Sequence, residues 1–222
     1  MNLKQIAGEK AAEYIEDGMV VGLGTGSTVY YTILKVGELV RSGYSLVGIP
    51  TSRATEELAR SLNIPLGTID EYPRIDLTID GADEVDPELN LIKGMGGALV
   101  REKIVAASSR KEIIVVDESK IVRQLGTRSP LPVEVVPFGA RFVHDRLSVF
   151  GGRPELRLKD GIAFVTDNGN NILDTTFDHI ADPRSLERSI NNLPGVVENG
   201  LFLGMTDMVI IGRESGVEIL EK

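Results

Sequence analysis

Short apolar segments alternate with segments of helical periodicity through the first half of the chain. This alternation constrains the fold more than any other feature, because apolar strands joined through helices form a parallel sheet that is covered on both faces. The expected strands are residues 19–21, 45–49, 75–79 and 112–116. The expected helices are residues 2–17, 27–41, 54–62 and 97–108. In sheets of this kind, ligands bind outside the carboxyl ends of the strands.

The order of the elements changes near Gly126. The elements expected after this point are strand 133–136, helix 138–150, strands 155–158 and 162–166, a helix that begins at Pro183, and strand 196–203. The strand at 162–166 is expected to continue past the turn-like residues 167–171. Their order, β-α-β-β-α-β, is that of the split ferredoxin-like unit. A last apolar strand, residues 208–212, is expected to return to the first sheet.

These patterns predict the fold class α/β with two domains. An α/β domain built on a parallel sheet is expected over residues 1–127 and 200–222. A ferredoxin-like α+β domain, residues 128–199, is expected to be inserted late in the first domain.

Charge and composition exclude several classes of function. The formal net charge of −9 argues against a nucleic-acid partner or an anionic membrane, because both bind broad basic surfaces. The chain has no cysteine, which excludes disulfides, thiolate metal ligands and thiol nucleophiles. Residues 1–16 lack the apolar core of a signal peptide, and no apolar run approaches the ~20 residues of a membrane span. We therefore expect a cytoplasmic protein.

A glycine-rich loop, Gly22 to Thr28, follows the first expected strand and precedes a helix. It does not match a dinucleotide fingerprint, because Ser27 stands at the third glycine position and no acidic residue ends the second strand. The Walker pattern is missing too. The loop can instead present backbone N–H groups and hydroxyls to one phosphate or to sugar hydroxyls, through Thr25, Gly26, Ser27 and Thr28. The alternative is a tight turn with Ser27 as the helix N-cap.

Two carboxylates follow the third expected strand. Asp80 ends the strand and Asp83 lies three residues later, with Gly81 and Ala82 between them. Carboxylates at this end of a strand, close to a phosphate loop, are candidates for proton transfer to sugar hydroxyls. Two alternatives remain, an Asx-turn or cap and a magnesium site. Neither histidine of the chain has a partner at metal-ligand spacing.

A lysine and a glutamate mark the next segment. Lys93 precedes three glycines, so its loop is expected to be mobile or held close to a ligand. Glu102 follows on a helix, with apolar neighbours three and four residues away on both sides. Partial desolvation of such a carboxylate favours a general base, although an ordinary salt bridge fits the pattern as well. Lys120, after the fourth strand, is either a phosphate ligand or a surface lysine.

At these residues the chain resembles the A type of ribose-5-phosphate isomerase. Each motif is weak alone, but together they are specific and run from end to end of the chain. The residues that carry the resemblance are Gly22–Thr28, Asp80–Glu84, Lys93–Gly94, Gly96–Ala98, Arg101–Lys103, Asp117 with Lys120, Phe164–Asn170 and Gly195–Phe202.

The resemblance implies reversible conversion of D-ribose 5-phosphate to D-ribulose 5-phosphate, a step of the pentose phosphate pathway, without metal or organic cofactor. It also implies that residues 1–127 and 200–222 form a Rossmann-like catalytic domain and that the inserted domain, residues 128–199, serves as a lid or for oligomerisation. The implied assembly is a homodimer or homotetramer. Glu102 would be the base that moves a proton between C2 and C1 through an enediolate. Asp80, Asp83 and Lys93 would line the reacting hydroxyls and the oxyanion, and either aspartate could assist ring opening. The implied substrate contacts are Thr25, Gly26, Ser27, Thr28, Gly81, Ala82, Gly94, Met95, Gly96, Lys120 and, near the start of the first helix, Lys4.

Two rival functions use similar loops. An amino-sugar-phosphate isomerase/deaminase would favour a histidine in the pocket, whereas His144 and His179 both fall in the expected second domain. A non-catalytic sugar-phosphate sensor would be expected to carry a DNA-binding helix-turn-helix and a basic surface, and the sequence shows neither.

Overall fold

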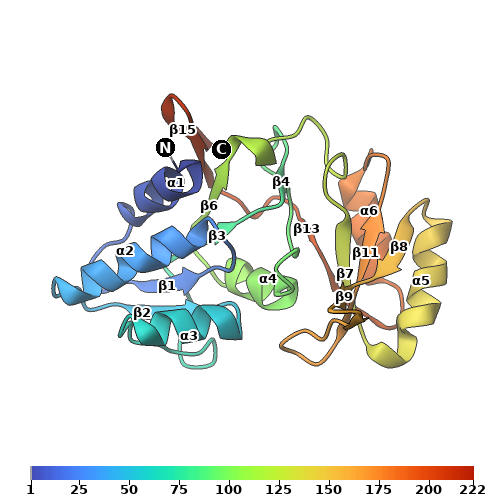
Figure 1. Ribbon diagram of the computed structural model, residues 1–222, viewed down its shortest axis with the longest axis horizontal. Helices are drawn as coiled ribbons and strands as arrows, with labels where there is room; N and C mark the ends of the chain where they lie inside the picture. The colour runs from blue at the N-terminus through green and yellow to red at the C-terminus, as the bar shows by residue number, and fades with distance from the viewer. Residues whose placement is uncertain (1) are drawn as a thin grey trace. The chain divides into compact units, whose positions relative to one another are not determined.

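The computed structural model describes residues 2–222, which form two compact units (Figure 1). The first unit comprises the residues up to Ala82, then Arg101–Ile121 and Met205–Lys222. The second comprises Asp83–Val100 and Val122–Gly204. The chain therefore passes between the units four times, and each unit is built from separate segments of sequence.

The first unit is built on a six-stranded sheet with the order β15-β14-β6-β3-β1-β2. All neighbouring strands are parallel except β15, which pairs antiparallel with β14 at the edge. The strands are β1 (Val20–Leu23), β2 (Val47–Pro50), β3 (Leu77–Gly81), β6 (Glu112–Asp117), β14 (Met208–Arg213) and β15 (Gly216–Glu221). The expected parallel sheet is confirmed, and so is the return of the last apolar strand to it.

Helices cover both faces of this sheet, as expected for apolar parallel strands. They are α1 (Leu3–Ala12), α2 (Val29–Arg41), α3 (Arg53–Ser61) and α4 (Leu99–Ala107). Val21 and Leu23 of β1 point into the core formed with α1 and α2. Gly22, between them, points to the other face, where a side chain would lie 2.7 Å from Cγ1 of Val105 in α4.

The first helix is shorter than the periodicity predicts. It begins after Asn2, whose side chain accepts hydrogen bonds from the N–H groups of Lys4 and Gln5. It ends at Ala12, because Tyr14 and the residue after it donate to carbonyls three residues back instead of four. The apolar pattern continues through this turn, which explains why the sequence predicts helix to residue 17.

The second unit contains a four-stranded antiparallel sheet with the order β12-β7-β11-β8. Its elements are β7 (Leu131–Val135), α5 (Ala140–Val149), β8 (Arg153–Leu156), β11 (Asn171–Thr176), α6 (Pro183–Asn191) and β12 (Val196–Asn199). The order along the chain is β-α-β-β-α-β, so the predicted ferredoxin-like unit is confirmed. Where strand 162–166 is expected, only the short hairpin β9 (Leu158–Lys159) and β10 (Ile162–Ala163) forms.

A small three-stranded sheet completes the second unit. It consists of β4 (Glu84–Val85), β5 (Leu91–Ile92) and β13 (Leu201–Phe202). The expected strand 196–203 is split at Gly200, whose N–H donates to Pro132 and whose carbonyl accepts from Lys93. A side chain at Gly200 would overlap the Lys93 carbonyl. The pairing of β5 with β13 places residues 83–100 in the second unit, whereas the sequence boundaries keep them in the first.

Glu84 anchors this small sheet to the segment that enters β7. Its carboxylate is fully buried and accepts hydrogen bonds from the backbone N–H groups of Gly126 at 2.7 Å, Arg128 at 2.6 Å and Ser129 at 2.5 Å. Hydrogen bonds to an ionised acceptor are stronger than neutral ones, and a buried carboxylate requires them. Glu84 therefore has a structural role in the second unit.

We expect Glu84→Gln to destabilise the protein by about 2 kcal/mol, because the neutral amide replaces a charged acceptor and turns an NH₂ group toward backbone donors. Urea unfolding of the two proteins measures the difference. Glu88→Gln is the control, since Glu88 is exposed on the neighbouring turn. Equal unfolding midpoints for Glu84→Gln and the unmodified protein would contradict this role.

Candidate active site

The glycine loop leaves β1 at the point where the strand order reverses. β2 pairs with one edge of β1, and β3 pairs with the other. In doubly wound sheets this reversal opens a crevice outside the carboxyl ends of the strands. The loop from Gly24 to Thr28 begins there, and Asp80 is the last residue but one of the adjacent strand, β3.

Asp80 fixes the glycine loop from this neighbouring strand. Its side chain is buried, with 1% of its surface exposed. Oδ1 accepts the Thr25 N–H at 3.0 Å and the Gly81 N–H at 2.7 Å. A side chain on Gly24 would overlap the Asp80 carboxylate, so the close approach requires glycine. The predicted acid and the predicted phosphate loop are thus in direct contact.

Thr25 is held by a cluster of hydroxyl groups. Its Oγ1 lies 2.8 Å from Oγ1 of Thr51, 2.8 Å from Oγ of Ser52 and 3.1 Å from Oγ1 of Thr55. Thr55 also donates to the Gly24 carbonyl at 2.9 Å. These partners come from the start of α3 and the turn before it, so this turn supports the base of the glycine loop. Sequence reasoning did not find them.

The outer part of the loop presents polar groups at the N-terminus of α2. The helix begins after Thr28, whose side chain makes no capping hydrogen bond, so the alternative with Ser27 as N-cap is wrong. Ser27 is exposed and accepts a hydrogen bond from Lys4 Nζ at 2.9 Å. Gly26 has φ of +132°, a left-handed conformation that favours glycine. A lysine beside a helix N-terminus attracts an anion.

Glu102 lies in the first turn of α4. It is buried, with 3% of its surface exposed. The apolar neighbours that the sequence places around it are buried as well: Ala98, Leu99, Val105 and Ala106. Carboxylates in the first turn of a helix are stabilised by the helix dipole. The arrangement supplies a carboxylate shielded from bulk water.

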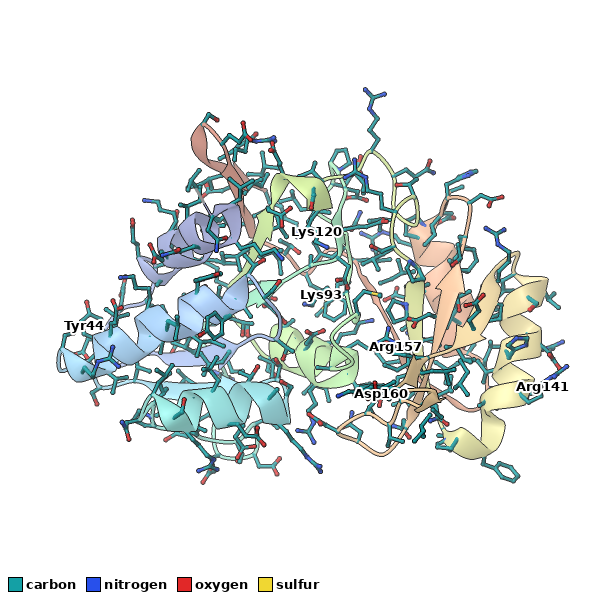
Figure 2. The ribbon with its side chains drawn as sticks, viewed as in Figure 1. Tyr44, Lys93, Lys120, Arg141, Arg157 and Asp160 are labelled. Carbon is teal, nitrogen blue, oxygen red and sulfur yellow. The ribbon has the colours of Figure 1, made fainter. Side chains whose placement is uncertain are left out.

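Lys120 follows the carboxyl end of β6, the strand that pairs with β3 on the side away from β1 (Figure 2). It ends the short 3₁₀ helix Glu118–Lys120, which is capped by the Asp117 side chain through the Ser119 N–H at 2.9 Å. Lys120 is half-buried. It therefore stands at the same edge of the sheet as Asp80 and the glycine loop.

Asp83 and Lys93 lie at the two ends of the β4–β5 hairpin in the second unit. The Asp83 N–H donates to the Ile92 carbonyl at 2.8 Å, and its Oδ2 accepts the Met95 N–H at 3.0 Å. Lys93 is 2% exposed, and its Nζ lies 5.4 Å from the centroid of the Phe202 ring. The hairpin thus brings a carboxylate and a buried ammonium group into one short segment.

The loop after Lys93 is fixed by packing and by hydrogen bonds. Gly94 and Gly97 have φ of +110° and +79°, and the Gly97 N–H donates to the Gly94 carbonyl at 3.0 Å. A side chain on Gly97 would lie 2.5 Å from Cζ of Phe164. Arg157 donates to the Gly94 carbonyl at 2.9 Å. These glycines serve backbone geometry and close packing, and no sequence motif pointed to Arg157.

The predicted site residues are divided between the two units. The first unit holds Lys4, Thr25, Gly26, Ser27, Thr28, Asp80, Gly81, Ala82, Glu102 and Lys120. The second unit holds Asp83, Lys93, Gly94, Met95 and Gly96. Within residues 2–222, no three histidine, aspartate or glutamate side chains are grouped to hold a metal ion. None of the helices in the same range has the length and apolar character to cross a membrane.

Comparison with known proteins identifies the family. The model of the family described as ribose 5-phosphate isomerase A (phosphoriboisomerase A) matches residues 47–216. Ribose-5-phosphate isomerase A of Gloeobacter violaceus is 54% identical, over 98% of this chain and 95% of the relative. The structure of ribose 5-phosphate isomerase A from Methanocaldococcus jannaschii is 45% identical in sequence and superimposes with a TM-score of 0.95. The match covers 100% of this chain and 99% of the other.

A second solved structure, D-ribose-5-phosphate isomerase in complex with phospho-erythronic acid, is also 45% identical. Its TM-score is 0.97, and each chain covers 100% of the other. Family model, sequence relatives and solved structures agree over essentially the whole chain. This protein belongs to the ribose 5-phosphate isomerase A family.

Proposed function

We propose how the predicted site residues of the two units carry out the reaction of the family, in which D-ribose 5-phosphate and D-ribulose 5-phosphate are interconverted. The chain is an aldose–ketose isomerase that binds a sugar phosphate. Three relatives that are 51–54% identical to this chain are named ribose-5-phosphate isomerase A, so a non-catalytic sensor is not favoured.

The glycine loop and two lysines bind the substrate, most directly its phosphate. Ser27 and Thr28 offer hydroxyl and N–H groups at the start of α2, and Lys4 holds its ammonium group 2.9 Å from Ser27 Oγ. Lys120 adds a cation at the same edge of the sheet. Binding energy from the phosphate then positions the carbonyl end of the sugar. The similar structure with bound phospho-erythronic acid, a phosphorylated sugar acid, supports this class of ligand.

Glu102 is the general base that moves the proton. It removes the C2 proton of the open-chain aldose, and the carbonyl oxygen on C1 becomes an enediolate oxygen. The same carboxyl group then returns the proton to C1, while the C2 hydroxyl gives up its proton to form the ketone and the C1 oxygen gains one. The observation that carries this assignment is the burial of Glu102 in the first turn of α4. A carboxylate shielded from water keeps the abstracted proton from exchanging before it is returned.

The other charged residues act on the oxygen atoms of the substrate. Lys93 stabilises the enediolate oxygen, because an ammonium group aimed at developing negative charge lowers the barrier. Asp80 and Asp83 exchange protons with the sugar hydroxyls, and one of them opens the furanose ring. We assign ring opening to Asp80. No step of this scheme uses a metal ion or an organic cofactor.

The oligomeric state, the cellular location and the role of the inserted domain are proposed from the resemblance. We propose a homodimer or homotetramer in the cytoplasm, in which the inserted ferredoxin-like domain serves as a lid or in subunit contact. Exposed apolar side chains on and beside α5 support subunit contact through this domain: Phe138, Phe142, Val149 and Phe150.

Glu102→Gln is expected to lower kcat about 10²- to 10⁴-fold, the usual contribution of a general base. Binding of ribose 5-phosphate should persist, because the amide keeps the size of the side chain. Turnover to ribulose 5-phosphate and calorimetric titration with ribose 5-phosphate measure the two properties. Glu38→Gln, an exposed glutamate on α2, is the control. A Glu102→Gln enzyme with nearly unchanged kcat would exclude Glu102 as the base.

Gly24→Ala tests the contact between the glycine loop and Asp80. The added methyl group would overlap the Asp80 carboxylate, so the acid or the loop must move. A displacement of about 1 Å at reacting groups can cost about 100-fold in rate, and we expect kcat/KM to fall by about that factor. Gly139→Ala is the control, because its methyl group would meet only the Gly195 Cα at 3.5 Å. Equal kcat/KM values in both variants would argue against the need for this close approach.

Treatment with EDTA tests the metal-free scheme. Since proton transfer by Glu102 and oxyanion stabilisation by Lys93 need no metal, kcat should be the same before and after dialysis against EDTA. The alternative is a magnesium ion at Asp80 and Asp83. Loss of activity in EDTA that added Mg²⁺ restores would favour that alternative.

A further inference from the structure

Arg157 is a nearly buried arginine between β8 and β9 in the second unit, and the mechanism above does not use it. Only 11% of its side chain is exposed. Its guanidinium group forms a bidentate ion pair with Asp174 of β11, in which Nε lies 2.8 Å from Oδ2 and Nη2 donates to Oδ1. This geometry fixes the plane of the guanidinium group, because both hydrogen bonds must form together.

The remaining nitrogen of the same group reaches the loop after Lys93 (Figure 2). Nη1 donates to the Gly94 carbonyl at 2.9 Å and to the Met95 carbonyl at 3.2 Å. The guanidinium group also lies 5.8 Å from the centroid of the Phe164 ring. Phe164 in turn packs against Gly97, at the other end of the loop. Arg157 thus contacts the loop directly and through an aromatic neighbour.

Met95 is held from two sides by these contacts. Asp83 Oδ2 accepts its N–H at 3.0 Å, and Arg157 binds its carbonyl. The peptide groups that follow Lys93 are therefore fixed between a carboxylate assigned to catalysis and a guanidinium that is itself fixed by Asp174. Glycine restricts the backbone little, and Gly94 and Gly97 of this loop have positive φ angles. The position of the loop therefore depends on its contacts with Asp83 and Arg157.

We propose that Arg157, oriented by Asp174, is a positioning residue that sets the backbone after Lys93 and so holds the Lys93 ammonium group in its catalytic position. The proposal rests on the role assigned to Lys93 above. A lysine at position 157 would keep the positive charge but could not form a bidentate pair with Asp174 and also donate to two carbonyl groups. Only the planar guanidinium group of arginine can make all of these hydrogen bonds at once.

The first test is Arg157→Lys, with kcat and KM for ribose 5-phosphate measured well below the thermal unfolding midpoint. We expect kcat to fall about 10- to 100-fold, as for misplacement of a catalytic group, with KM changed less than about threefold. Arg153→Lys is the matched control, because Arg153 lies on the same region of chain and pairs with exposed Asp178 at 2.9 Å. It should keep the unmodified kcat. A merely structural role would lower the unfolding midpoint of Arg157→Lys and leave kcat unchanged, which would overturn the proposal.

The second test is a double-mutant cycle with Lys93→Met. If Arg157 acts through Lys93, the effect of Arg157→Lys on kcat should largely disappear in the Lys93→Met enzyme. An undiminished effect there would overturn the proposal. A Lys93→Met enzyme with unchanged kcat would overturn the catalytic role of Lys93 itself and this inference with it. If Arg157→Lys does not fold, Asp174→Asn replaces it in the same cycle, with the same expected coupling.

Discussion

The hydrogen bond from the Thr25 N–H to the Asp80 carboxylate is the contact on which the first half of the site depends. It joins the ends of two adjacent parallel strands at the point where the strand order reverses. The contact forms only because position 24 carries no side chain. A single buried carboxylate thereby sets the course of the loop that precedes α2, while remaining at the edge where ligands bind such sheets.

Burial of charge is shared by three of the four groups assigned to catalysis, the exception being the half-buried Asp83. Glu102, Asp80 and Lys93 are each at most 3% exposed. Buried charges are costly unless fixed dipoles or partners compensate them, and the structure provides a helix N-terminus for Glu102 and backbone N–H groups for Asp80. Such preorganised groups need little rearrangement when charge develops on the substrate, which suits an enediolate reaction.

The sequence predicted the parts of this protein that repeat or lie close together along the chain. Alternating apolar strands and helices revealed the parallel sheet, and the β-α-β-β-α-β order revealed the second fold. It could not predict contacts between distant residues that follow no period. The hydroxyl groups around Thr25, the three N–H groups on Glu84, and the bond from Arg157 to Gly94 join residues roughly 26 to 63 positions apart. The break at Gly200 was missed because apolar residues stand on both sides of the short segment Glu198–Gly200.

The Glu84 carboxylate has a consequence for anyone who divides this chain into fragments. A piece cut at residues 128–199 would contain the complete ferredoxin-like sheet but neither Glu84 nor β5. The N–H groups of Arg128 and Ser129 would lose their acceptor. The apolar side chain of Ile92, which packs in the same core as Val133, would be missing as well. Such a fragment would therefore expose part of its apolar core to solvent and would be prone to self-association. A fragment that also contains residues 83–100 would keep Glu84 and Ile92 and so would cover that part of the core.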